Sequence, residues 1–136
     1  MKVVLDPNVI AIGLVPSGTT GAVLNAWLDD RSYELVVCSL LLQELEGVQR
    51  RPKFRSVPGE TVDLLVARLR SEATVLDDPA LDVGVTPDPD DDYLVALARQ
   101  AGASLLVSGD PDLHGIGPHG FEVLSPRQFL ERLGKA

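Results

Sequence analysis

Four acidic residues stand where an α/β fold could gather their carboxylates at one point: Asp6, Glu44, Asp92 and Asp110. Asp6 and Asp110 each follow closely on a short apolar run that is typical of a buried strand. Open parallel sheets bind ligands at the carboxyl ends of their strands. Because gathered carboxylates repel each other unless a divalent cation holds them, these residues predict a metal site.

The size and composition of the chain indicate one globular domain. Its 136 residues are 45% hydrophobic, enough to bury a core, so we expect a single domain over residues 1–136. No apolar stretch is long enough to span a membrane, and the lone Cys38 cannot form an internal disulfide. We therefore expect a cytoplasmic protein with no membrane contact.

The net charge of −8 argues at first against a nucleic-acid partner, because phosphate binding usually leaves a basic surface. However, four of the twelve basic residues lie within six positions, at Arg50, Arg51, Lys53 and Arg55. Taken alone, this run indicates a solvated helix end. A surface with separate acidic and basic regions is nevertheless compatible with RNA.

Apolar runs and helical periodicities alternate along the chain. Five runs predict strands, at Val3–Leu5, Leu35–Cys38, Ala73–Leu76, Leu105–Val107 and Phe121–Leu124. Periodic apolar residues and caps predict helices near Val23–Leu28, from Ser39, near Val62–Leu69 and Leu94–Ala101, and from Ser125-Pro126. Continuous apolar strands separated by helices predict an α/β fold whose central parallel sheet is covered on both faces.

Each acidic position also has a purely structural interpretation. Asp6-Pro7-Asn8 and Gly109–Asp112 are ordinary turn sequences, and this interpretation suits Asp112 better than a site. Glu44 lies at the edge of an apolar helical stripe, where it could pair with a metal or extend into solvent. Asn8 and Ser108 could support a neighbouring carboxylate by hydrogen bonding.

The run Asp88-Pro89-Asp90-Asp91-Asp92 stands before a predicted helix. Acidic residues stabilise a first helical turn, and Asp90 is a candidate N-cap. A calcium-binding loop is excluded because Tyr93 and Arg99 replace the glycine and the glutamate that it requires. The run holds more like charges than capping needs, so we expect at least one of them to face a metal.

Four of these segments, in this order, resemble the signature of PIN domains, and more narrowly of VapC-like toxin components of toxin–antitoxin pairs. They are Leu5-Asp6-Pro7-Asn8-Val9, Glu44, Asp88–Leu94 and Leu106–Leu113. The resemblance implies a PIN-like three-layer α/β/α fold and a Mg²⁺- or Mn²⁺-dependent ribonuclease. It also implies an RNA substrate, a small antitoxin partner and a homodimer.

By the same resemblance, the acidic quartet that holds the metal and performs catalysis would be Asp6, Glu44, Asp92 and Asp110. Asp112 is a candidate fifth metal ligand, and Asn8 and Ser108 are supporting residues. Asp92 is preferred to Asp91 because it directly precedes the apolar pattern of the helix, but the two remain alternatives. Oxygen ligands suit Mg²⁺ or Mn²⁺ better than zinc.

One departure from the family pattern supports a second hypothesis. Pro7 stands where family members usually carry a threonine or serine, so a hydroxyl is lost beside the site. A catalytically weakened PIN module that acts by binding RNA or a partner is therefore the alternative. A phosphotransferase with Asp6 as nucleophile is weaker, because Asn8 replaces the second aspartate that such enzymes carry.

Overall fold

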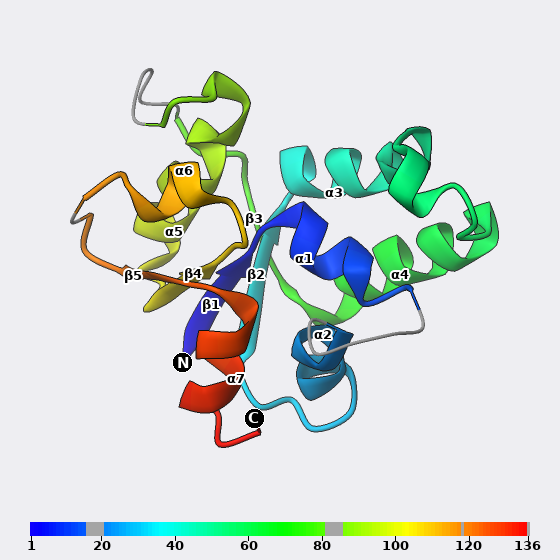
Figure 1. The fold of residues 1–136 in the computed structure, drawn as a ribbon, viewed down its shortest axis with the longest axis horizontal. Coiled ribbons are helices and arrows are strands. Elements are labelled where there is room, and N and C mark those ends of the chain that lie inside the picture. Colours follow the sequence, from blue (N-terminus) through cyan, green and yellow to red (C-terminus); the bar gives the residue numbers. More distant parts are fainter. Residues whose placement is uncertain (16–20, 81–85, 118, 136) are drawn as a thin grey trace.

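Five parallel strands form one central sheet in the computed structural model, which describes residues 1–15, 21–80, 86–117 and 119–135 (Figure 1). The strands are β1 (Lys2–Leu5), β2 (Glu34–Cys38), β3 (Thr74–Leu76), β4 (Leu105–Val107) and β5 (Glu122–Leu124). Their order across the sheet is β3-β2-β1-β4-β5, and every pairing is parallel. The predicted α/β fold and all five predicted strands are confirmed.

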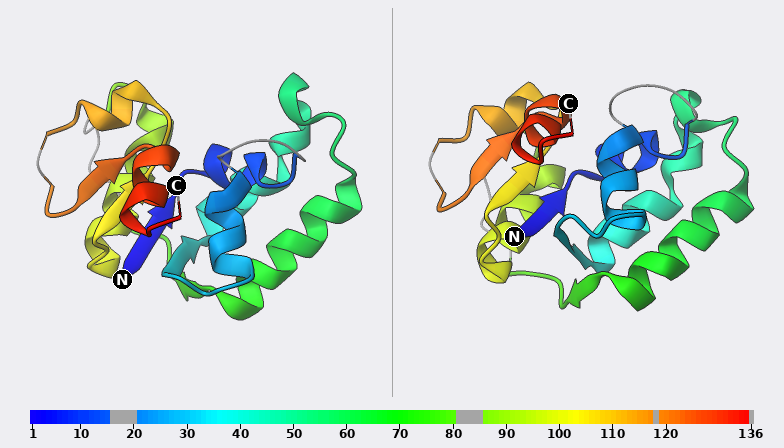
Figure 2. Two further views of the ribbon diagram at one scale, coloured as in Figure 1. Left: turned by 60° about the horizontal axis from the view of Figure 1, so that its bottom comes forward. Right: turned by 90° about the horizontal axis from the view of Figure 1, so that it is seen from below.

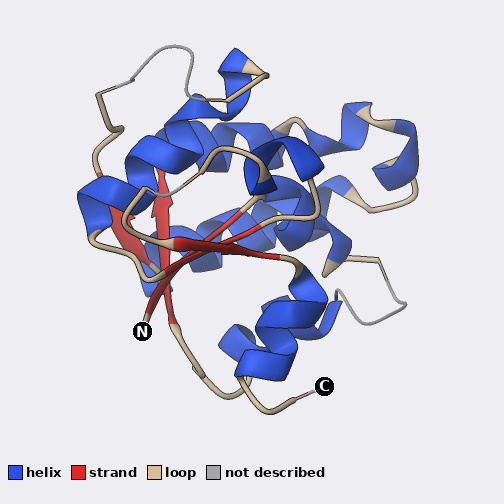
Figure 3. Ribbon diagram, turned by 60° about the vertical axis from the view of Figure 1, so that its left-hand side comes forward, coloured by secondary structure: helices blue, strands red, loops and turns tan. Residues whose placement is uncertain are grey.

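Helices lie on both sides of this sheet (Figures 1 and 2). They are α1 (Pro7–Ile12), α2 (Gly21–Leu28), α3 (Ser39–Glu46), α4 (Gly59–Glu72), α5 (Asp92–Ala101), α6 (Pro111–His114) and α7 (Pro126–Arg132). Figure 3 shows the strands enclosed between them. None of the helices in the described part of the chain is both long and apolar enough to cross a bilayer.

Two short helices replace segments that the sequence predicts as turns. In α1 the side chain of Asp6 accepts a hydrogen bond from the backbone of Asn8, and in α6 Asp110 accepts one from Asp112. A proline follows each capping aspartate, and its fixed backbone angle suits the first helical position. Each aspartate thus caps the residues that follow it, as the turn interpretation expects, but these residues form a short helix and not a simple turn.

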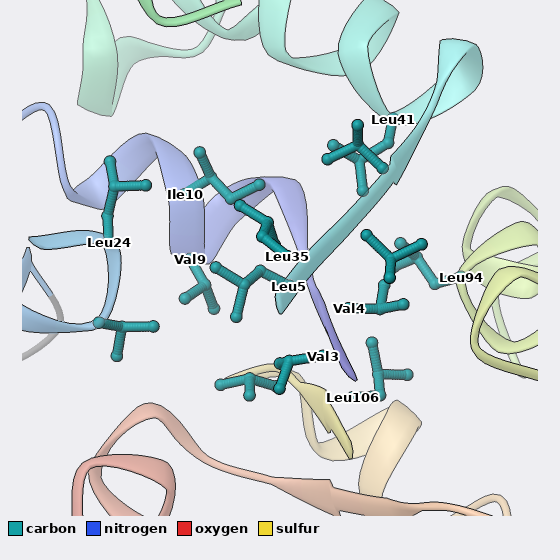
Figure 4. Packing of buried hydrophobic residues seen from close by; sticks show 14 of the residues in the cluster. Val3, Val4, Leu5, Val9, Ile10, Leu24, Leu35, Leu41, Leu94 and Leu106 are labelled. Atoms are coloured by element: carbon teal, nitrogen blue, oxygen red, sulfur yellow. The ribbon is translucent and has the colours of Figure 1, made fainter. Parts of the chain in front are cut away.

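The buried side chains of β1 explain how the layers are held together. Val3, Val4 and Leu5 are fully buried, as expected for a central strand that is covered on both faces. In Figure 4, Val4 points towards Leu94 of α5, whereas Leu5 points to the other side of the sheet, towards Val9. Alternate residues of one strand therefore anchor helices on opposite faces.

The strand order also determines where a site can form. From β1 the chain builds outward through β2 and β3, and it then returns to place β4 on the other side of β1. The direction of building thus reverses between β1 and β4. Open α/β sheets leave a crevice at such a reversal, at the carboxyl ends of the two strands. Asp6 follows β1 there, and Ser108 and Asp110 follow β4.

Candidate acidic site at the ends of β1 and β4

Ser108 links the two aspartates that follow the central strands. Its Oγ donates a hydrogen bond to Asp6 Oδ2 over 2.7 Å and accepts one from the backbone N–H of Asp110 over 3.0 Å. Leu5 pairs with Val107 in the sheet, so the two segments leave it side by side. Ser108 is fully buried and Asp6 is 6% exposed. The hydroxyl therefore holds the carboxylate of Asp6 and the backbone of Asp110.

His114 lies next to the backbone carbonyl of Ser108 and helps to hold this residue in place. Its Nε2 lies 2.7 Å from the carbonyl oxygen of Ser108, which accepts the hydrogen bond when Nε2 carries the proton. The backbone N–H of Ser108 donates to the carbonyl of Leu124 at the end of β5. Ser108 is thus held through its N–H, its carbonyl and its side chain.

Helix α3 brings Glu44 to the same edge of the sheet. The helix follows directly on β2, and its N-terminus is capped by Asp78, whose Oδ1 accepts from the N–H of Leu40 over 2.9 Å. Leu41 and Leu45 are buried against the core, and Glu44 lies beside them half-buried. The apolar stripe of α3 therefore places the Glu44 carboxylate at its margin, facing the ends of the strands.

Asp91 and Asp92 occupy different surroundings although they are adjacent. Asp92 is 2% exposed, and its Oδ1 accepts hydrogen bonds from the N–H of Thr86 over 2.7 Å and from Thr86 Oγ1 over 2.8 Å. It thereby holds the preceding segment onto α5. Asp91 is half-buried at the N-cap of α5.

The predicted N-cap at Asp90 is wrong. A 3₁₀ turn over Pro89–Asp91 precedes α5, and its start is held by Asp88, whose side chain accepts from the N–H of Asp90. This extra turn moves the start of α5 one residue further along the chain.

These residues surround a pocket of about 730 Å³ that is open to solvent. Six acidic residues line it: Asp6, Glu44, Asp88, Asp90, Asp91 and Asp110. Asn8, Gln43, Arg50, Arg51 and Tyr93 complete its polar lining. Asp92 and Asp112 are absent from the part of the lining that the structure describes. Asp112 is exposed at the start of α6.

Burial, followed by mutual repulsion, governs the electrostatics of the carboxyl groups in this acidic pocket. Burial and, after it, the charges of the neighbouring carboxylates together raise the pKa of Asp91 to about 7; these neighbours are Asp6, Asp88, Asp110 and Glu44. Burial also raises the pKa of Glu44, with added repulsion from Asp6 and Asp90. Tyr93 and Arg51 oppose this shift. The carboxylates therefore act on one another and are not fully compensated by the protein.

Two arginines supply positive charge at the wall of the pocket. Arg50 and Arg51 lie between α3 and α4, where the chain forms 3₁₀ turns over Val48–Arg50 and Pro52–Phe54. The guanidinium of Arg51 donates to the side-chain oxygen of Asn8. The interpretation of this basic run as a solvated helix end is therefore incomplete, because two of its members belong to the pocket.

Tyr93 carries a buried hydroxyl beside Glu44. The residue is 5% exposed, and its oxygen has no hydrogen-bond partner among the described residues. Burial raises the pKa of Tyr93, and the Glu44 carboxylate raises it further, which places the two groups near each other. The two groups are close to each other, but no hydrogen bond joins them. Buried hydroxyl groups without a partner are rare in folded proteins, so this one indicates a position where a further group can bind.

The chemistry of the lining fits a divalent cation. The donors are carboxylate oxygens, which Mg²⁺ and Mn²⁺ prefer, and an ion would offset their repulsion. In the described parts of the chain, no three carboxylate, imidazole or thiolate groups converge tightly enough to form a finished ion site. The six acidic residues are instead distributed around the lining of the pocket.

The structure thus brings together Asp6, Asn8, Glu44 and Asp110 of the residues expected from the sequence, with Ser108 beneath them. Sequence reasoning missed Tyr93 and the pocket arginines. A signal for the arginines existed in the basic run, but nothing in the sequence indicated which of its members turn towards the acids. For Tyr93 the signal was its position directly after the acidic run.

A family model described as PIN domain matches residues 2–112 of this chain. A search of curated proteins finds no match.

Three solved structures share the fold at low sequence identity. PAE2754 from Pyrobaculum aerophilum has a TM-score of 0.65 and 19% identity, covering 99% of this chain and 90% of its own. VapBC2 from Rickettsia felis, bound to a promoter DNA fragment, has a TM-score of 0.60 and 17% identity, covering 92% and 98%. FitAcB from Neisseria gonorrhoeae has a TM-score of 0.57 and 20% identity, with the same coverage.

Two buried tyrosines allow the unpaired hydroxyl to be tested. Tyr33 Oη donates to the carbonyl of Val23 over 2.7 Å, so Tyr33→Phe should lower the free energy of unfolding by about 1 kcal/mol. Tyr93→Phe should leave stability unchanged or raise it slightly, because it removes a buried group without a partner. Urea unfolding of both variants measures the difference. An equal loss in the two variants would show that the Tyr93 hydroxyl is already paired.

Removing the Asp91 charge should stabilise the metal-free protein in a pH-dependent way. The folded-state pKa of about 7 lies above the unfolded value near 3.8. Between these values the folded state keeps a proton that the unfolded state has lost, so stability falls as pH rises. In EDTA, Asp91→Asn should match the wild type near pH 4 and exceed it above pH 7. After solvent screening is allowed for, we expect a gain of about 1–2 kcal/mol.

Thermal unfolding at several pH values measures this effect, and Asp63→Asn on the exposed face of α4 is the control. A pH-independent difference between Asp91→Asn and the wild type would contradict the assigned repulsion.

Proposed function

Because this chain belongs to the PIN domain family, we propose that it is a Mg²⁺- or Mn²⁺-dependent ribonuclease. The observation that carries the proposal is the pocket at the ends of β1 and β4, where six carboxylates face two arginines. Phosphodiester hydrolysis needs groups that hold a divalent cation and groups that hold a phosphate. Both kinds line this one pocket.

We assign the metal-holding quartet to Asp6, Glu44, Asp91 and Asp110. The choice of Asp91 in place of Asp92 is supported by its place in the pocket lining and by its interactions with the other three acids. Asp92 instead holds Thr86 and so stabilises the entry to α5. Asp112 is left out of the quartet because it is exposed at the start of α6.

In the proposed reaction, water adds across a P–O bond of RNA, with its oxygen going to phosphorus and its proton to the leaving ribose oxygen. A bound divalent ion supplies Lewis acidity, which favours ionisation of the attacking water and neutralises charge on the phosphate. Ser108 orients the Asp6 carboxylate and holds the backbone of Asp110. The guanidinium groups of Arg50 and Arg51 bind the phosphate oxygens and so place the substrate.

The chemistry of the neighbours extends the proposal to partners. VapBC2 was solved bound to a DNA fragment from "their promoter", wording that refers to more than one protein, and the sequence resembles VapC-like toxin components; we therefore propose a small antitoxin partner and a homodimer for this chain. RNA is the proposed substrate. The negative net charge does not exclude this, because Arg50 and Arg51 line the pocket and a divalent cation held by the carboxylates would add positive charge where the phosphate would lie.

A second function is favoured by Pro7, which is buried at the start of α1, beside Asp6, and has no hydroxyl. In this alternative the pocket binds a divalent ion, together with either RNA or a protein partner, but does not catalyse cleavage. Cleavage that is absent in the wild type and gained in Pro7→Thr would favour it.

Cleavage of a mixed RNA panel by purified protein in Mn²⁺ or Mg²⁺ tests the proposal. Asp110→Asn keeps an acceptor for the N–H of Asp112 but removes the charge, and it should slow cleavage at least about 100-fold. Asp63→Asn removes an equal charge from α4 and should cleave like the wild type. EDTA should abolish cleavage. Activity that survives Asp110→Asn would contradict the assigned site.

Metal-induced stabilisation separates the two candidates for the third acid. A metal that binds only the folded state at ten times its Kd should add about 1.4 kcal/mol of stability. Asp91→Asn should reduce this Mn²⁺-dependent gain. Asp92→Asn should lower stability in EDTA, since it weakens the contacts with Thr86, yet keep the gain. Thermal unfolding with and without Mn²⁺ measures the stability and the metal-dependent gain of each variant. Loss of the gain in Asp92→Asn, with the gain kept in Asp91→Asn, would assign Asp92 to the metal.

A further inference from the structure

A second hollow adjoins the acidic pocket. Its volume is about 470 Å³, and it shares Asp6, Asn8 and Asp110 with the pocket. The two aspartates joined by Ser108 therefore stand at the boundary between two adjacent spaces. A substrate whose phosphate lies at these aspartates would continue into the second space, which we name the flanking hollow.

The remaining walls of the flanking hollow differ in chemistry from the acidic pocket. Val9 and Ile12 come from α1, Pro126 from the start of α7, and Gly109 from the segment after β4. Lys53 is the one charged residue in the described lining that the acidic pocket does not share. The hollow thus offers aliphatic surface and one exposed ammonium group beside the proposed cleavage site.

We propose that the flanking hollow binds the nucleotide next to the scissile phosphate of a single-stranded RNA. The base would pack against the aliphatic walls, and Lys53 would contact the adjoining phosphate. A nucleobase has flat faces of low polarity and is tethered to an anion, so it matches this combination. The inference rests on the proposed ribonuclease function and specifies its substrate.

The proposed preference for single-stranded RNA follows from the access of a base to the flanking hollow. A base inside a duplex is stacked and paired, and it cannot enter a lateral hollow without being unstacked. In a single strand the base is free to turn out of the backbone. A duplex of the same sequence should therefore be a poorer ligand and a poorer substrate.

Gly109 allows the hollow to be filled without backbone strain. A Cβ added at this position would meet no atom within 4 Å, and its backbone is outside the left-handed region. Gly109→Leu should therefore fold normally while occupying space that the base needs. Gly109→Ala adds one carbon and should have a smaller effect.

Lys53 and Arg55 form a matched pair for the charge. Both are exposed and lie two residues apart, but only Lys53 lines the hollow in the described part of the chain. Lys53→Ala should weaken RNA binding and reduce the salt dependence by about 0.7 in the log–log slope, the value for one phosphate of a single strand. Arg55→Ala should change both quantities less.

The experiment measures binding of a fluorescein-labelled, mixed-sequence RNA decamer by anisotropy, its cleavage in Mn²⁺, and Mn²⁺ affinity by calorimetry. We expect Gly109→Leu to raise the Kd for RNA about tenfold, in keeping with the loss of one base contact. Its melting temperature and Mn²⁺ affinity should match the wild type. After the cleaved bond is mapped, an abasic nucleotide on one side of it should weaken binding to the wild type but not to Gly109→Leu.

The outcomes separate this inference from the function on which it rests. If the wild type neither binds nor cleaves RNA, the proposed function fails and the inference fails with it. If the wild type cleaves RNA, but Gly109→Leu and Lys53→Ala bind the decamer with wild-type affinity, only the inference is overturned. Equal binding of single-stranded and duplex RNA would also overturn it.

Discussion

The hydrogen bond between Ser108 Oγ and Asp6 Oδ2 joins the ends of two strands that are 102 residues apart in sequence. The rest of the site depends on it, because the same oxygen also accepts from the backbone of Asp110. The bond requires the parallel register in which Leu5 pairs with Val107. That register is in turn held by a strand whose side chains are buried on both faces. The register of the core strands thus positions the carboxylate of Asp6 and the backbone of Asp110.

The acidic pocket opposes the stability of the domain that carries it. Burial and like charges raise the pKa of Asp91 and of Glu44, so ionising them costs free energy. Tyr93 adds a buried hydroxyl without a partner among the described residues. Sites that bind ions or transition states commonly carry such unfavourable features, which the remainder of the fold must offset. Here the apolar layers on both faces of the sheet do so.

The distribution of charge bears on how an acidic chain would bind the proposed anionic substrate. The net charge of −8 describes the whole molecule, whereas a phosphate senses the groups within about a Debye length, roughly 8–10 Å. At the pocket, those groups include Arg50 and Arg51 together with any cation that the carboxylates hold. Lys53 extends the positive charge beside the neighbouring hollow. Because six carboxylates outnumber the two arginines of this lining, the approach of a phosphate depends on the cation that the carboxylates would hold.

The sequence alone determined the fold class, the five strands and most of the helices, because apolar runs and helical periodicity are local signals. It also singled out Asp6, Glu44 and Asp110, which line the pocket, since strand ends and a helix margin can be read from the chain. The tertiary structure decided which of Asp91 and Asp92 faces the pocket, because the 3₁₀ turn before α5 sets their directions. It likewise decided that Arg51 reaches Asn8, across 43 residues. Such contacts depend on how separate elements pack, and no local pattern encodes that packing.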